Sequence, residues 1–213
     1  MDSLDTTMAP DTAFSYGCRR CGQCCRDKRI QINPYETARL QRRLGVTTAE
    51  FRASYTADGA GVALAQKDDG FCIFFGDAGC TVHSDRPLVC RLFPLGRVIN
   101  AKGEVRIVKG EFDPPARGDF GTDGTIDAFF DGQGAGPFIA AADAYFSWYV
   151  RAVDATPADD AGDYGDLSDM DGVLAAHARI ANAPEPDDIA ARTTLHLNLL
   201  NRFIQGDHHD QSL

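Results

Sequence analysis

Seven cysteines, all between residues 18 and 90, constrain this chain more than any other feature of its sequence. The first four form a C-x2-C-x2-CC run, and the whole set is Cys18, Cys21, Cys24, Cys25, Cys72, Cys80 and Cys90. A single cysteine is commonly a small buried hydrophobe, but core packing gives no reason for four thiols in so short a run. The array therefore predicts a segment organised around sulfur chemistry.

The cellular compartment decides what such an array does. Residues 1–16 have no basic n-region and no apolar h-region, so no secretory signal is predicted. No apolar run is long enough for a membrane span. We therefore expect a cytoplasmic protein, in which clustered thiols are metal ligands or catalysts rather than disulfides. The net charge of −10 is opposite to that of most nucleic-acid-binding modules, so no nucleic-acid partner is expected.

The spacing of the first cysteines suits a metal centre. A C-x2-C turn brings two sulfurs within reach of one metal ion, and Cys18, Cys21 and Cys24 repeat it as the first ligands of a bacterial ferredoxin motif do. The fourth ferredoxin cysteine is missing from this run, so a later cysteine would have to replace it. Seven thiols exceed one four-ligand site, so some are spare or two metals share a thiolate. His83, at C-x2-H spacing from Cys80, is a further candidate zinc ligand, although a lone histidine is more often a surface residue.

Basic residues accompany the cysteines of this acidic chain. We expect Arg86 and Arg91, which lie near Cys90, to offset the charge of metal-bound thiolates and to lower the pKa of the thiols. The basic residues near the first cysteines, including Arg19 and Arg20, are equally consistent with a solvated surface.

Four phrases of the sequence resemble a known family. They are C18-R-R-C21-G-Q-C24-C25, F71-C72-I-F-F, G79-C80-T-V-H83 and R86-P87-L-V-C90-R91-L-F-P94. They are similar to the YkgJ-type cysteine-cluster family, a zinc- or iron-chelating domain named for its CxxCxxCC motif. The resemblance covers about residues 16–110 and implies that all seven cysteines chelate metal. A related branch, the flagellin lysine N-methylases, is longer and is thought to carry an iron–sulfur cluster.

Three functions stay open at this point. The first is a metal-binding protein whose structural or redox site holds zinc or a [4Fe–4S] cluster, and which binds a protein partner. The second is an iron–sulfur-dependent protein-modifying enzyme, or an accessory, that resembles the lysine methylases. The third is a thiol redox sensor built on Cys24 and Cys25. Whether the chain is an enzyme is left undecided, since no catalytic signature is found.

The expected fold class is α+β. A small, irregular, metal-stapled domain would be followed by a helical C-terminal extension. The predicted divisions are a flexible N-terminus over 1–16, a cysteine-cluster domain over 17–110, a Gly-, Asp- and Pro-rich linker loop over 111–136 and a helical extension over 137–213.

Local signals predict individual elements. Asn33 is expected to cap a helix that ends at Gly45, and Thr47 with Glu50 forms the capping box of a second helix. The alternation of residues 62–66 predicts a strand. Two more strands, residues 95–100 and 104–109, would flank a Lys102-Gly103 turn.

Overall fold

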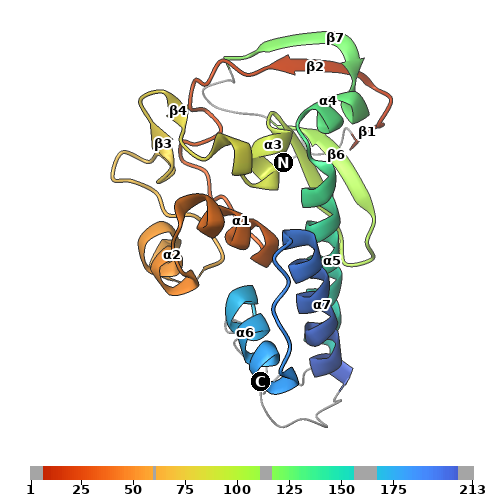
Figure 1. Cartoon of the computed structure of the whole chain (residues 1–213). Helices are drawn as coiled ribbons and strands as arrows, with labels where there is room; N and C mark the ends of the chain where they lie inside the picture. Colours follow the sequence, from red (N-terminus) through yellow and green to blue (C-terminus); the bar gives the residue numbers. More distant parts are fainter. Residues whose placement is uncertain (1–6, 60, 111–116, 156–166, 206–213) are drawn as a thin grey trace. The chain divides into compact units, whose positions relative to one another are not determined.

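The computed structural model describes four stretches of the chain, residues 7–59, 61–110, 117–155 and 167–205 (Figure 1). Helices and small antiparallel sheets are both present, which confirms the α+β class. The chain divides into two compact units, Met1–Gln31 with Ala63–Ile139, and Ile32–Val62 with Ala140–Leu213. Parts of the predicted N-terminus (1–6) and linker (111–116) lie outside the described residues.

The described residues of the first unit form three small antiparallel sheets. One has the strand order β1-β6-β5, a second pairs β2 with β7, and a third pairs β3 with β4. Their bounds are β1 Thr7–Met8, β2 Ala13–Gly17, β3 Phe75–Gly76, β4 Gly79–Cys80, β5 Leu95–Ile99, β6 Val105–Lys109 and β7 Asp119–Thr125.

The β5–β6 hairpin confirms the prediction for residues 95–109. Its turn is closed by Asn100, whose side-chain oxygen accepts from the backbone amides of Lys102 and Glu104, both at 3.0 Å. Gly103 has φ +81°, a left-handed conformation that glycine adopts without a Cβ clash.

Two predictions for this unit were wrong. Residues 13–16 of the N-terminus expected to be flexible belong to β2, and residues 119–132 of the predicted linker loop form β7 and the helix α4 (Ile126–Gly132). The two strands lie side by side in Figure 1, with Tyr16 opposite Phe120. Pairing between segments about a hundred residues apart overrides the local Gly- and Asp-rich composition, because sheet formation depends on context.

The core of the first unit joins residues of β2, β5 and β6 to residues of α3 and α4. Phe14 of β2 meets Phe129 of α4 edge to face, with ring centroids 5.1 Å apart. The buried cluster is Phe14, Leu92, Leu95, Ile107, Ile126, Phe129, Phe130 and Ala135. Burying one such large apolar side chain stabilises a fold by about 1.5–3 kcal/mol. The same cluster anchors α3 (Leu88–Leu92), which carries Cys90.

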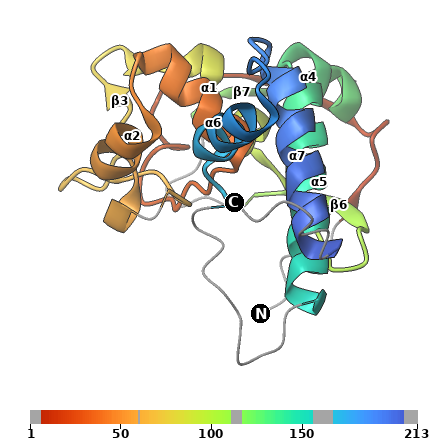
Figure 2. The ribbon, with the colours of Figure 1, turned by 60° about the horizontal axis from the view of Figure 1, so that its bottom comes forward.

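The second unit is built from helices. They are α1 Pro34–Leu44, α2 Thr48–Tyr55, most of α5 (Gly136–Ala155), α6 Met170–Ala181 and α7 Ile189–Gln205, with a 3₁₀ turn at Ala57–Gly59. α5 and α7 run side by side in both views (Figures 1 and 2), joined by a 3.1 Å hydrogen bond from Trp148 Nε1 to the carbonyl of Leu200. Within the described stretches, no helix has the length and apolar character needed to cross a membrane.

Local capping explains where the first two helices begin. Asn33 and Glu36 exchange hydrogen bonds with each other's backbone amides, and Thr47 and Glu50 repeat the arrangement. Gly45 ends α1 at φ +70°. These observations confirm the predicted starts and the predicted stop, because each signal acts within one helical turn.

Two buried polar residues of the second unit hydrogen-bond to specific partners, although Nε of Arg192 is buried without one. His196 is fully buried, with Nδ1 at 2.9 Å from the hydroxyl of Tyr145 and Nε2 at 2.9 Å from the carbonyl of Leu167. Arg192 donates to Asp171 at 2.7 Å and to Glu185 at 2.8 Å. A buried polar group without such a partner costs about 1–3 kcal/mol, so these contacts fix how α5, α6 and α7 pack.

Candidate metal centre

The first cysteines lie on a loop that leaves β2. Two left-handed residues shape it, Arg20 at φ +53° and Gly22 at φ +81°. The backbone amide of Arg20 lies 3.4 Å from Cys18 Sγ, and the amide of Cys25 donates to the carbonyl of Gly22 at 2.8 Å. The loop is therefore coiled by its own backbone, with amides directed at sulfur and carbonyl oxygens.

Cys72 is brought to this loop by backbone pairing. Its amide donates to the carbonyl of Cys25 at 2.7 Å, and Arg26 forms a bridge with Phe71. The segment 62–66, predicted as a strand, makes only isolated bridges, at Ala63, Leu64 and Gln66, within the described residues, so that prediction was wrong. Without a continuous neighbouring strand the alternating pattern cannot extend into a ladder.

Cys80 and Cys90 come from two other elements. Cys80 ends β4 and faces Phe75 across the hairpin. Cys90 lies on α3, whose first turn follows Pro87. Four separate segments of the chain thus supply sulfur to one region.

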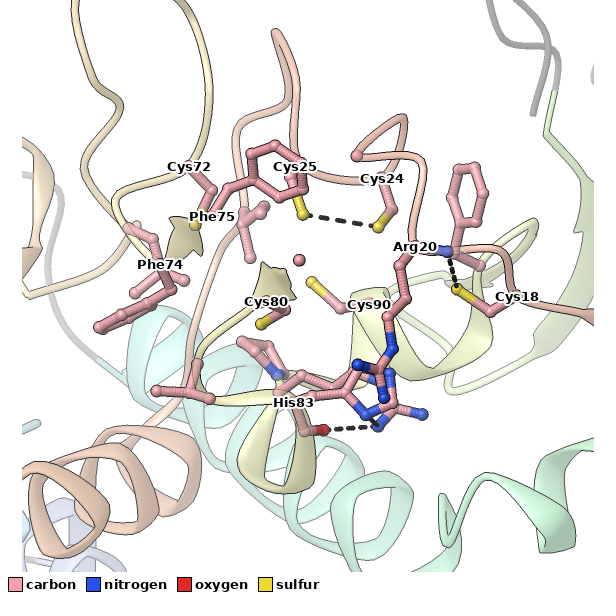
Figure 3. A pocket seen from close by; sticks show the side chains of 18 of the residues that line it. Cys18, Arg20, Cys24, Cys25, Cys72, Phe74, Phe75, Cys80, His83 and Cys90 are labelled. Carbon is pink, nitrogen blue, oxygen red and sulfur yellow. Dashed lines mark hydrogen bonds between the residues drawn. The ribbon is translucent and has the colours of Figure 1, made fainter. Parts of the chain in front are cut away.

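Six of the seven cysteines line a single cavity of about 220 Å³. In Figure 3 the sulfurs of Cys24, Cys25, Cys80 and Cys90 surround its centre, with Cys72 on one side and Cys18 beyond Arg20 on the other. Cys21 does not line it. The remaining wall is mostly apolar and comprises Tyr16, Ile30, Leu64, Phe74, Phe75, Val82, Pro87, Phe93 and Phe129, among others.

The sulfurs are spread around the cavity rather than gathered at one point. Cys24 Sγ and Cys25 Sγ are 3.6 Å apart. Among the described residues, which include every cysteine, no group of three or more Cys, His, Asp or Glu side chains is arranged to hold one metal ion. A four-coordinate zinc site needs four ligands about 2.0–2.3 Å from a single ion.

The thiols perturb one another's protonation. Cys25 donates a hydrogen bond to Cys24, which holds the pKa of Cys24 at about 7, and the same bond together with burial raises the pKa of Cys25. Burial raises the pKa of Cys72 to about 11 and also raises the pKa of Cys80. Negative charge on Cys24 also raises the pKa of both Cys72 and Cys80, so thiols from separate segments interact electrostatically. A positive ion or cluster would relieve this mutual repulsion.

The two arginines expected to offset thiolate charge differ in role. The guanidinium of Arg86 lowers the pKa of Cys24 and opposes the rise at Cys80. Arg91 is buried and donates to the carbonyls of Ser84, Arg86 and Gln133. Arg91 therefore fastens α3 to its neighbouring loops, a role that its position in the sequence did not indicate.

His83 also lines the cavity. Its Nδ1 is 3.2 Å from Nη1 of Arg86, and since a guanidinium has only donors, Nδ1 accepts and the ring proton lies on Nε2. The pKa of His83 is lowered by partial burial and by the charges of Arg86, Arg20 and Arg91. Three guanidinium groups around one ring make this corner positive and disfavour a metal cation there.

Sequence reasoning missed an aromatic cover over the first cysteine loop. Phe71 and Phe75 stack with centroids 4.5 Å apart, and Arg26 lies over the Phe71 ring. A Cβ on Gly22 would come within 2.7 Å of Phe75 and 2.9 Å of Phe71. The sequence signal was Phe71 just before Cys72 and Phe75 three residues after it, which gave no direction for their rings.

Tyr16 was missed as well, because it lay in the segment expected to be loose. It lines the cavity, and its ring packs against Phe93 and Phe120. Burial raises the pKa of Tyr16 to about 12, and charge on the nearby thiols Cys18, Cys21 and Cys24 adds to the rise. Tyr16 therefore stays protonated and closes one wall of the cavity.

Comparison with known proteins agrees with this geometry over the part of the chain that holds the cysteines. Residues 17–109 match the model of the CxxCxxCC family, described as "Putative zinc- or iron-chelating domain". The search of curated proteins and the search of solved structures gave no significant match.

Proposed function

This chain carries, over residues 17–109, a domain of the zinc- or iron-chelating CxxCxxCC family, and we propose that its cavity binds a polynuclear centre, an iron–sulfur cluster. The observation that supports the proposal most is the convergence of six thiols from four segments on one largely apolar cavity. The proposed ligands come from the five inner cysteines, Cys24, Cys25, Cys72, Cys80 and Cys90.

The arrangement of the sulfurs favours a cluster over one zinc ion. A cluster binds cysteines at its corners, so its ligands need not converge on one point. The spread of sulfurs around about 220 Å³ fits that requirement. Cys18 is exposed and Cys21 lies outside the cavity lining, so both are assigned as spare thiols.

The residues of the chain would protect and tune such a centre. The guanidinium of Arg86 stabilises the thiolate form of Cys24. The stacked rings of Phe71 and Phe75, with Tyr16 and Phe93 in the wall, exclude water. A bound iron–sulfur cluster supplies one-electron redox chemistry whose potential depends on such burial and nearby charge. It would also cross-link four chain segments, so metal binding would contribute to folding.

The test is metal and sulfide analysis of protein purified without oxygen, with matched serine variants. We expect about four irons and four sulfides per chain and a broad visible absorption band. Cys25→Ser and Cys90→Ser should lose most of the iron, whereas Cys21→Ser should keep it. One zinc per chain without iron, or equal iron loss in all three variants, would refute the proposal.

A thiol redox sensor is a second candidate, supported by one observation. Cys24 and Cys25 are 3.6 Å apart, and the pKa of Cys24 is about 7, so thiolate is available at neutral pH. Hydrogen peroxide would convert the two thiols to a disulfide and itself to two waters. Mass spectrometry of metal-free wild-type and Cys24→Ser protein after mild peroxide tests this: a Cys24–Cys25 disulfide supports the sensor, and unchanged thiol counts exclude it.

A further inference from the structure

We propose that the rim of the cysteine cavity binds a small oxyanion, a carboxylate or phosphate group, between the guanidinium of Arg20 and Nε2 of His83. This goes beyond the proposed metal centre and does not require it.

Arg20 is held in position, and none of the described residues is an acidic partner for it. Its backbone is left-handed, at φ +53°, which is costly for a residue with a Cβ. Its side chain lies on Gly79, where an added Cβ would be only 3.3–3.6 Å from Cβ, Cγ and Cδ of Arg20. Among the described residues its guanidinium makes no hydrogen bond or ion pair. Arg20 therefore presents a fixed charge with free donors at the cavity.

The adjacent residue shows that this is unusual for the loop. Arg19 is also exposed but is bound by Asp119, with Nε at 2.8 Å from Oδ2. Within the described residues, Arg19 is therefore neutralised by a carboxylate and Arg20 is not. Unpaired charge in a strained backbone conformation is typical of a binding position.

His83 supplies the second donor. Its Nδ1 accepts from Arg86, so Nε2 carries the ring proton. Within the described part of the chain, Nε2 has no hydrogen-bond partner. Figure 3 shows His83 and Arg20 on the same side of the cavity, and the charge of Arg20 acts on the ring.

The surroundings select an anion. The described residues that line the cavity include no Asp or Glu, although the chain has 31 acidic residues. Arg86 already donates to the carbonyl of His83, and to Oε1 of Gln133 at 2.6 Å. Its charge also stabilises the thiolate form of Cys24. Of the two described arginines that line the cavity, Arg20 is therefore the one whose guanidinium can bind a ligand. A guanidinium fork with a neighbouring N–H matches the planar or tetrahedral oxygens of carboxylate and phosphate.

The test is calorimetric titration of the full chain, metal-loaded and metal-free, with inorganic phosphate and separately with succinate at low ionic strength. Arg20→Gln keeps the length of the stem but removes the charge, and Arg19→Gln is the matched control. We expect one-to-one binding of at least one probe by wild type and Arg19→Gln, and binding about 10- to 100-fold weaker in Arg20→Gln. The probe that binds more tightly identifies the oxyanion class.

A second readout locates the ion. The imidazole ¹H and ¹³C resonances of His83, assigned by His83→Gln, should shift on titration in wild type and not in Arg20→Gln. Equal affinity in Arg20→Gln and Arg19→Gln, no binding of either probe, or an unshifted His83 signal would overturn the proposal. Metal content is measured on the same samples, so loss of the metal centre and loss of anion binding are distinguished.

Discussion

Substitution of Gly22 by alanine tests whether the aromatic cover is packed against the first cysteine loop. The new Cβ would meet two ring atoms, at 2.7 Å on Phe75 and 2.9 Å on Phe71. The backbone is also left-handed, at φ +81°. A non-glycine residue in this conformation costs about 1–2 kcal/mol, and overpacking costs a further 1–3 kcal/mol or so. We therefore expect the free energy of unfolding to fall by about 2–5 kcal/mol.

Gly103→Ala is a close control, because Gly103 has the same φ of +81° and nothing within 4 Å of an added Cβ. It lies in the same compact unit. The Gly103→Ala variant should lose only the free energy that the left-handed backbone costs a non-glycine residue, about 1–2 kcal/mol. The difference between the unfolding free energies of the two variants therefore measures the cost of the clash with the two rings.

The assay is urea unfolding followed by circular dichroism, with metal content measured on each sample. Gly22→Ala should lose metal as well as stability, and Phe75→Leu in the same chain should restore part of both, since it shortens the contacted side chain. The reasoning is refuted if Gly22→Ala and Gly103→Ala unfold within about 0.5 kcal/mol of each other with unchanged metal content.

Three further predictions concern the second unit, and urea unfolding followed by the fluorescence of its tryptophan checks each. Burial lowers the pKa of His196 from 6.5 to about 4, so between these pH values the unfolded state binds more protons than the folded state. The free energy of unfolding should therefore fall by about 3 kcal/mol as the pH falls from 6.5 to 4. An equally steep fall in the His196→Gln variant would contradict this. Tyr145→Phe removes the hydroxyl that donates to His196 and should cost about 1–3 kcal/mol at pH 7, whereas a cost below about 0.5 kcal/mol would show that the pair contributes nothing. Phe51→Ala removes a fully buried ring of α2 and should cost about 3–5 kcal/mol, against almost none for Val153→Ala on the exposed face of α5.

Local signals in the sequence were reliable where a few neighbouring residues determine the structure. The capping residues Asn33 and Thr47 correctly located two helices, and the Lys102-Gly103 turn located a hairpin. The pairing of β2 with β7 left no such signal, because its two segments are about a hundred residues apart and β7 is rich in Gly and Asp. Its formation depends on partners that composition does not reveal.

The site shows the same division. The sequence identified the cysteines and Arg86 as residues of interest, since both follow from spacing and charge. It could not separate inner thiols from outer ones, because that separation depends on the backbone pairing between Cys25 and Cys72. Nor could it distinguish Arg20 from Arg19, since only the fold supplies Asp119 to one of them.

The first unit is discontinuous in the chain, since residues 32–62 belong to the second unit. During translation Cys25 therefore leaves the ribosome 65 residues before Cys90 (90 − 25). At a translation rate of about 5–20 residues per second, the last cysteine of the cavity is synthesised about 3–13 s after the first four. The cavity can close only after that interval, so any metal bound earlier would be held by an incomplete set of ligands.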